Sequence, residues 1–123
     1  MTTTSCFAPR AIDSIEEVGI LCKEFDVFHM VNNAYGLQCS RIASDLAATL
    51  KKGRLDVLVS STDKNFMVPV GGSIVYSPHK KQIVDKVNKM YPGRASAAPI
   101  IDLFVTLLSM GETVLKQLLK ERK

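Results

Sequence analysis

Two polar clusters in the sequence each follow an apolar run that is typical of a buried strand. The first cluster is Asn32-Asn33-Ala34-Tyr35-Gly36, and the second is Ser60-Ser61-Thr62-Asp63-Lys64-Asn65. Ligands of open parallel sheets bind at the carboxyl ends of the strands. We therefore expect both clusters to line one crevice, in which Lys64 carries the most distinctive chemistry.

Lys64 allows two interpretations. A lysine whose stem is partly buried at a strand end can present a neutral amine, which is the nucleophile that Schiff-base chemistry needs. Alternatively, Lys64 is a surface loop lysine that pairs with its neighbour Asp63. The spacing alone favours the surface pairing and leaves the reactive amine as the second interpretation.

Hydrophobic periodicity predicts the elements that hold these clusters. A helix near residues 14–25 begins with a capping box formed by Ser14 and Glu17. The other predicted elements are a strand over 27–31, a helix over 42–50 that is capped by Gly53, a strand over 55–60, a loop over 60–72, a strand over 73–76, a helix that begins at Ser77-Pro78, and a long helix from Pro99 with a bend at Gly111.

This order of elements predicts an α/β fold with a partial, doubly wound, mostly parallel sheet. At least two parallel strands are joined by a right-handed crossover. The sheet looks incomplete, because the helix near 14–25 needs a preceding strand for which the sequence shows no apolar run. We therefore expect residues 1–123 to be a segment of a larger domain.

The composition is that of one ordinary soluble globular unit, with 123 residues of which 46% are hydrophobic and 23% charged. A membrane span needs about 18 to 20 apolar residues, and the longest apolar stretch, 95–111, is interrupted by Pro99 and Asp102. We therefore expect no membrane, and we expect a cytoplasmic location because no targeting segment is legible. The three cysteines and two histidines lack metal-ligand spacing, so we expect no metal site.

Basic residues gather in the second part of the chain. Residues 1–50 carry three basic and six acidic side chains, a net charge of −3, and residues 51–123 carry thirteen basic and six acidic, a net charge of +7, which together give the overall +4. This distribution suits binding to a polyanion such as nucleic acid, and it equally suits a solvated helix surface.

Four separate blocks of sequence resemble one enzyme family. They are TTSCFAPR at 3–10, VNNAYG at 31–36, DKNFMVPVGG at 63–72 and KMYPGRAS at 89–96. Together and in this order, they closely resemble the O-phosphoseryl-tRNA(Sec):selenocysteinyl-tRNA synthase (SepSecS) family of fold-type I pyridoxal phosphate (PLP) enzymes. The resemblance extends from Thr3 to Lys123.

The resemblance implies a transferase of selenocysteine biosynthesis. Such an enzyme uses PLP to convert O-phosphoseryl-tRNA(Sec) to selenocysteinyl-tRNA(Sec), with selenophosphate as the selenium donor. Residues 1–123 would be a central segment of its PLP-binding large domain, without the upstream half and the C-terminal small domain. The full-length protein would be a homo-oligomer, a tetramer built as a dimer of dimers.

The resemblance also implies a role for each matching residue. Lys64 matches the Schiff-base lysine, whose freed amine removes the seryl Cα proton. The other implied contacts are Asn32 with the pyridine nitrogen, Ala34 with the face of the cofactor ring, Tyr35 with the cofactor's phenolic oxygen, Ser61 with the cofactor phosphate, Arg94 with the phosphoseryl group and Lys51 with the tRNA. Tyr35 as a core aromatic and Ser61 as a loop-capping hydroxyl remain alternatives.

Two other functions remain open from the sequence. The first is a non-catalytic truncated paralogue or basic tRNA-binding fragment in which Lys64 is idle. The second is another PLP enzyme, such as a cysteine desulfurase or a selenocysteine lyase. Those enzymes use a mobile catalytic cysteine, and the positions of Cys6, Cys22 and Cys39 argue mildly against that function. We expect the isolated segment to be inactive.

Overall fold

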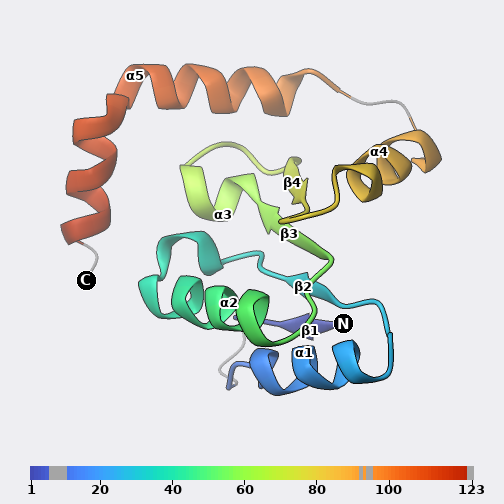
Figure 1. Cartoon of the computed structure of the whole chain (residues 1–123). Coiled ribbons are helices and arrows are strands. Elements are labelled where there is room, and N and C mark those ends of the chain that lie inside the picture. Colours follow the sequence, from blue (N-terminus) through green and yellow to red (C-terminus); the bar gives the residue numbers. More distant parts are fainter. Residues whose placement is uncertain (6–10, 92, 94–95, 122–123) are drawn as a thin grey trace.

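The computed structural model describes residues 1–5, 11–91, 93 and 96–121. Helices and strands alternate along the first half of the chain, and the last third is helical (Figure 1). The elements are β1 (Thr2–Thr3), α1 (Ile15–Glu24), β2 (Met30–Asn32), the 3-10 helix η1 (Gly36–Gln38), α2 (Ser40–Lys52), β3 (Val57–Ser61), α3 (Thr62–Phe66), β4 (Ser73–Tyr76), α4 (Lys81–Met90) and α5 (Ala98–Glu121).

The four strands form one sheet in the order β1-β2-β3-β4. β1, β2 and β3 are parallel, and β4 is antiparallel to β3. The predicted α/β fold with a mostly parallel sheet is therefore confirmed. The prediction that no strand precedes the first helix is wrong. β1 lies before α1 and pairs with β2, with Thr2 opposite Val31 and Thr3 opposite Asn32.

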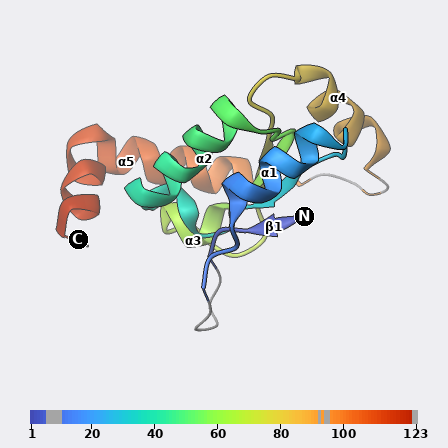
Figure 2. The same cartoon turned by 60° about the horizontal axis from the view of Figure 1, so that its bottom comes forward.

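Helices α1 and α2 lie side by side against the sheet (Figure 2). Their contact with the sheet forms the core cluster, in which Ile15 of α1 meets Val31 of β2 and Leu58 of β3, with Leu55 beside them. Val31 and Leu58 are directly opposite each other in the parallel register, so they point to the same face. This packing fixes the start and the direction of β2 and β3.

Several predicted boundaries need correction. Ser14 is the N-cap of α1, but its side chain makes no capping hydrogen bond, so the predicted capping box does not form. Asp13 instead accepts a hydrogen bond of 2.7 Å from the Thr3 amide, which ties β1 to the start of α1. The helix that was predicted to begin at Ser77-Pro78 begins later, at Lys81, because the Ser77 hydroxyl accepts a hydrogen bond from the Lys80 amide and forms a turn.

The predicted loop over 60–72 contains the short helix α3. This helix has only five residues and ends where Met67 adopts a left-handed conformation with φ of 55°. One helical turn is too short to show a hydrophobic period, which explains why the sequence did not reveal it. Lys64, the residue whose chemistry the sequence singled out, lies within this helix.

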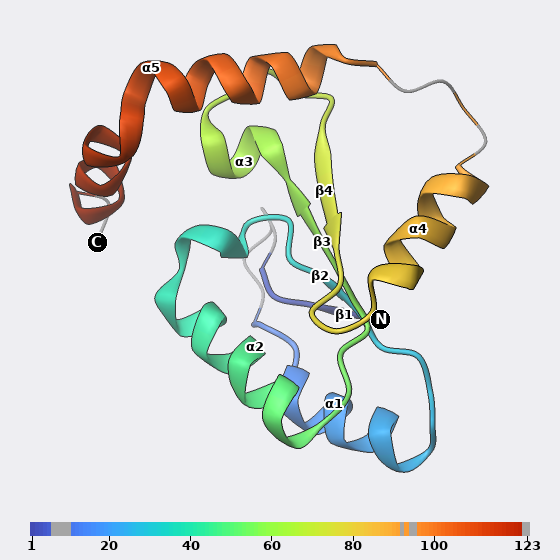
Figure 3. The same cartoon turned by 45° about the horizontal axis from the view of Figure 1, so that its top comes forward.

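Helix α5 runs beside α3, away from α1 and α2 (Figure 3). It bends at Gly111, which has φ of 64°, as predicted. By length and composition α5 is apolar enough to cross a membrane, with a mean hydropathy of 1.5 over 18 residues. The expectation that no such stretch exists is therefore wrong, because Pro99 begins the helix instead of interrupting it. One such helix is weak evidence for a membrane, since a helix that packs in a protein core passes the same test.

Candidate functional site

The carboxyl ends of β2 and β3 are joined by hydrogen bonds between the two predicted polar clusters. The amide of Ser61 donates to the carbonyl of Ala34 at 3.3 Å. The side-chain amide of Asn65 donates to the same carbonyl at 2.7 Å and to the carbonyl of Ser61 at 2.6 Å. The side chain of Gln38 donates to the carbonyl of Lys64 at 2.9 Å. The two clusters therefore meet at one edge of the sheet, and the prediction that they line a crevice there stays a prediction.

Lys64 lies at the centre of this edge. Its Nζ atom donates to Oδ2 of Asp63 at 3.1 Å and to Oγ of Ser61 at 3.3 Å. The same nitrogen lies over the ring of Tyr35, 5.5 Å from its centroid, within the range of a cation–π contact. The structure thus contains the ion pair with Asp63 that the surface-lysine interpretation predicts. It also contains the strand-end position that the reactive-amine interpretation predicts.

Asp63 is a well-held carboxylate. Its Oδ1 accepts a hydrogen bond from the Ser61 hydroxyl, and its Oδ2 accepts one from Lys64. These two hydrogen bonds, of which the one from Ser61 has the larger effect, hold the pKa of Asp63 below its usual range. The side chain of Asp63 is 15% exposed and that of Lys64 is 31% exposed, so solvent screens the pair only partly.

The orientation of the Asn32 side chain is fixed by the backbone. Oδ1 of Asn32 accepts a hydrogen bond of 3.1 Å from the Ala34 amide. Because a backbone N–H can only donate, the carboxamide oxygen must face Ala34 and the NH₂ group must face away from it. Asn32 and Ala34 are both half-buried. The NH₂ group of Asn32 is therefore directed away from the Ala34 amide.

Asn65 and Asn33 are positioning residues that the sequence analysis did not single out. Asn65 is buried, and its Oδ1 has no hydrogen-bond partner among the described residues. Asn33 is also buried and accepts from the Thr4 hydroxyl at 2.8 Å while donating to the Tyr76 hydroxyl at 3.3 Å. Asparagine in a polar cluster reads as a turn residue, so only the fold distinguishes these buried amides from exposed ones.

Two predicted substrate contacts lie away from this edge or cannot be placed. Arg94 is outside the described residues. Lys51 is exposed in the last turn of α2, which leads to the start of β3. Since Lys64 follows the end of β3, the structure does not bring Lys51 and Lys64 together.

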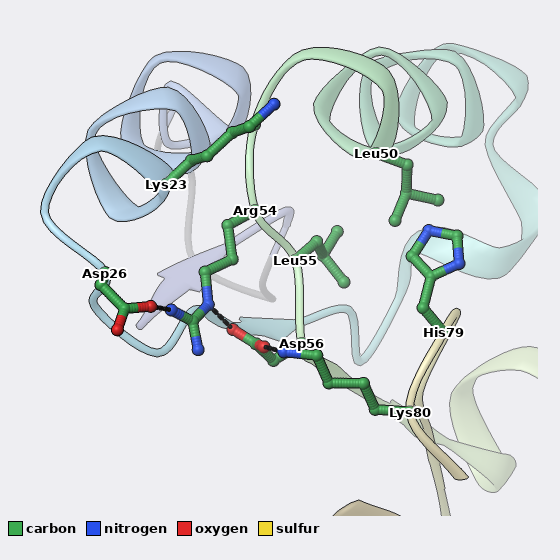
Figure 4. Close-up of a pocket in the computed structure, with 9 residues that line it drawn as sticks. Lys23, Asp26, Leu50, Arg54, Leu55, Asp56, His79 and Lys80 are labelled. Atoms are coloured by element: carbon green, nitrogen blue, oxygen red, sulfur yellow. Dashed lines mark hydrogen bonds and ion pairs between the residues drawn. The ribbon is translucent and has the colours of Figure 1, made fainter.

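A second polar group lies at the opposite, amino end of β3, where it lines a pocket (Figure 4). Asp56 accepts hydrogen bonds from Nε of Arg54 at 2.7 Å, from Nζ of Lys80 at 2.9 Å and from the amide of His29 at 2.9 Å. Arg54 also pairs with the exposed Asp26. Burial raises the pKa of Asp56, but the hydrogen bonds from Arg54, His29 and Lys80 together lower it by more than burial raises it. The pKa of Asp56 therefore lies below its usual range.

The fold and the lysine at the strand end define an α/β protein of the doubly wound class, with its candidate site at the carboxyl edge of the parallel strands. The family model described as O-phosphoseryl-tRNA(Sec) selenium transferase, SepSecS, matches residues 1–123. The chain therefore belongs to the SepSecS family. This match confirms the resemblance found in the sequence, and the family is a family of enzymes.

Known relatives agree with this assignment. The O-phosphoseryl-tRNA(Sec) selenium transferase of Dictyostelium discoideum is 52% identical over 99% of this chain and 25% of its own length. That of Methanopyrus kandleri is 44% identical over 100% of this chain and 28% of its own length. The crystal structure of an archaeal SepSecS superposes with a TM-score of 0.87 at 38% identity, covering 98% of this chain and 27% of that one. The chain thus spans about a quarter of the length of these relatives.

Proposed function

We propose that this chain is the lysine-bearing segment of a PLP-dependent enzyme that converts O-phosphoseryl-tRNA(Sec) to selenocysteinyl-tRNA(Sec), with selenophosphate as selenium donor. The observation that carries the proposal is the position of the Lys64 amine, which lies at the carboxyl end of β3 and over the Tyr35 ring from the end of β2. The match of the whole chain to the SepSecS family supports the same conclusion.

The residues at the strand ends suit PLP. Lys64 supplies the amine for covalent attachment, and Tyr35 supplies an aromatic ring and a phenol beside it. The outward NH₂ of Asn32 is a donor for the pyridine nitrogen. The buried Oδ1 of Asn65, which has no partner among the described residues, is a further polar atom at this edge. When bound, PLP withdraws electrons from the substrate's α-carbon.

Lys64 moves the proton in the proposed reaction. With the cofactor bonded to substrate, the Nζ of Lys64 would be a free amine that could take the proton from the seryl Cα as phosphate leaves from the β-carbon. Asn65 and Gln38 hold the backbone on both sides of this lysine through the carbonyls of Ser61 and Lys64. The amine therefore starts each cycle from a fixed backbone position, which general-base catalysis requires.

The tRNA and the phosphoseryl group meet other residues in this proposal. We assign Arg94 to the phosphoseryl phosphate, since a guanidinium can bind phosphate through two hydrogen bonds. We assign the exposed Lys51 to the tRNA backbone, where a lysine provides charge without the bidentate geometry of arginine. We further propose that the full-length protein acts in the cytoplasm as a homotetramer.

Cofactor attachment to Lys64 tests the proposal in a full-length protein. We define the full-length chimera as the Dictyostelium discoideum relative in which the matching segment is replaced by this chain. Incubation with PLP should give the absorbance of a bound cofactor, and borohydride reduction should leave the cofactor on the peptide that contains Lys64. Lys64→Arg should abolish attachment, whereas Lys86→Arg, a change in the exposed face of α4, should not.

The reaction itself separates the remaining possibilities. The chimera should release phosphate from phosphoseryl-tRNA(Sec) and should form selenocysteinyl-tRNA(Sec) when selenophosphate is added. Release of sulfur or selenium from a free amino acid would instead indicate a desulfurase or a lyase. Binding of tRNA with no cofactor on Lys64 would indicate the non-catalytic fragment and would overturn the proposal.

A further inference from the structure

Ser61, Asp63 and Lys64 form a closed set of contacts at the end of β3. The Ser61 hydroxyl donates to one oxygen of Asp63, and the Lys64 ammonium donates to the other at 3.1 Å. Lys64 also donates to the Ser61 oxygen at 3.3 Å. The ammonium also lies over the ring of Tyr35. Each of the three side chains therefore contacts the other two.

The backbone keeps this set of contacts in place. Asn65 donates to the carbonyls of Ser61 and Ala34, which ties α3 to both strand ends. Asp63 and Lys64 occupy the same short helix, so their separation depends on side-chain rotation alone. The carboxylate is largely buried at 15% exposure, and it is held by the Ser61 hydroxyl as well as by Lys64. Asp63 is thus a preformed acceptor for the lysine.

We propose that Asp63 is a positioning residue that holds the Lys64 ammonium in the cofactor-free protein, and again after the freed amine has taken the proton from the seryl Cα. The proposal rests on the proposed function of Lys64 as the cofactor-bearing lysine. In each cycle the amine is freed and must then be kept near the reacting atoms, and Asp63 with Ser61 provides the position to which it returns. The ion pair must open before Lys64 can react again.

The opening of this pair has a chemical cost in the attachment step. An ammonium has no lone pair, so one proton must leave Nζ for solvent before the nitrogen can bond to the aldehyde carbon, and the aldehyde oxygen then departs as water. The contacts of Nζ with Asp63 and Ser61 must also break before the nitrogen can bond to another atom. Attachment should therefore be faster without the negative charge at this position.

The same geometry bears on the role of Ser61. The Ser61 hydroxyl donates its hydrogen bond to the Asp63 carboxylate. The negative charge of this carboxylate would repel a phosphate group bound beside Ser61. The contacts favour Ser61 as the residue that orients Asp63 over Ser61 as a cofactor-phosphate ligand. Ser61 is the N-cap residue of α3, but its side chain makes no capping hydrogen bond, so the alternative of a loop-capping hydroxyl is wrong.

The test compares three variants of the full-length chimera in two assays. Asp63→Asn keeps the shape and removes the charge, Asp63→Glu restores the charge, and Asp85→Asn removes an exposed carboxylate on α4 as a control. The first assay is the rate of PLP attachment to the cofactor-free chimera, followed by absorbance. The second is the rate at which trinitrobenzenesulfonate labels Lys64 in the cofactor-free chimera, measured by mass spectrometry relative to Lys80.

We expect Asp63→Asn to raise both rates at Lys64 by roughly two- to five-fold, the range for a partly exposed ion pair. Asp63→Glu should return both rates to near the wild-type values, and Asp85→Asn should not change them. The ratio to Lys80 guards against unfolding, which would speed labelling of both lysines. Rates unchanged or lowered in Asp63→Asn would overturn the inference. Failure of PLP to attach to the unmodified chimera would instead contradict the proposed function, and the labelling assay would still decide the role of Asp63.

Discussion

Replacement of Asp56 should strongly destabilise the fold, because this carboxylate connects three segments far apart in the sequence. Its side chain is 1% exposed, and it accepts hydrogen bonds from Arg54 and Lys80 (Figure 4). It also accepts one from the amide of His29. His29 is itself buried, and its Nδ1 donates to the carbonyl of Arg54 at 2.7 Å. Loss of the carboxylate therefore affects the start of β2, the approach to β3 and the approach to α4 at once.

The size of the effect follows from the exposure of each partner. Three hydrogen bonds to a charged group, at about 1.5 to 3 kcal/mol each, set an upper limit. The side chains of Arg54 and Lys80 are 22% and 53% exposed, so water replaces much of what they lose. The His29 amide is left unpaired in the interior, at a cost of about 1 to 3 kcal/mol. Together with the lost pairing, Asp56→Ala should lower the free energy of unfolding by about 3 kcal/mol, at the lower end of the range for breaking a buried ion pair.

Urea denaturation of the 123-residue chain, followed by circular dichroism, measures this change. The control is Asp45→Ala, which removes an ion pair with Arg41 on the surface of α2 and should change the free energy of unfolding by at most about 0.5 kcal/mol. The denaturant slope should stay constant if both variants unfold from the same native state. A change in Asp56→Ala no larger than that of the control would refute the reasoning.

Three further predictions concern pH, packing and the cofactor. Because hydrogen bonds hold the pKa of Asp56 below its unfolded value of about 3.9, the stability that it contributes should be present above that pH and should be lost as the pH falls through the folded pKa; wild type and Asp56→Asn should converge in acid denaturation. Gly53→Ala should lower the melting temperature, because the added Cβ would lie 2.5 Å from the backbone of Gly19. Asn32→Asp should protonate the pyridine nitrogen of bound PLP, as measured by ¹⁵N NMR, and should speed phosphate elimination. An unprotonated ring in that variant would contradict the proposed contact between residue 32 and the pyridine nitrogen, which was inferred from the hydrogen bond between Asn32 and the Ala34 amide.

The buried strands and the strand-end clusters were predictable from sequence, because both depend on local pattern. β4 lies at the predicted residues, and β3 begins and ends within two residues of the predicted bounds. The strand predicted over 27–31 was only partly right, because Val27 and Phe28 are exposed and β2 covers Met30–Asn32. β1 was not predictable, since Thr2 and Thr3 carry no apolar pattern. Thr2 is nevertheless buried, because its hydroxyl contacts Nε2 of His29 at 2.9 Å. A polar strand becomes favourable only when a distant partner satisfies it.

The candidate site, too, was predictable from the sequence only in part. The type and position of Lys64 pointed to its chemistry, whereas the contacts that hold it depend on the fold. Asn65 looks like any polar loop residue until α3 places its amide between the carbonyls of Ala34 and Ser61. Asp63 was predicted as the partner of Lys64, and the pair is present. What the sequence did not indicate is that Ser61 fixes this carboxylate, because a hydroxyl two residues away has many possible acceptors.

The two ends of β3 show how one short strand separates stability from chemistry. At its amino end the carboxylate of Asp56 is almost fully buried and each of its oxygens is engaged by a cation, so its charge serves the fold. At its carboxyl end the carboxylate of Asp63 engages one cation, Lys64, whose amine would have to leave the pair in the reaction proposed above. A partly exposed pair is weak enough to open on each cycle, whereas a buried pair is not. The difference in burial between the two aspartates therefore suits one to structure and the other to a lysine that reacts.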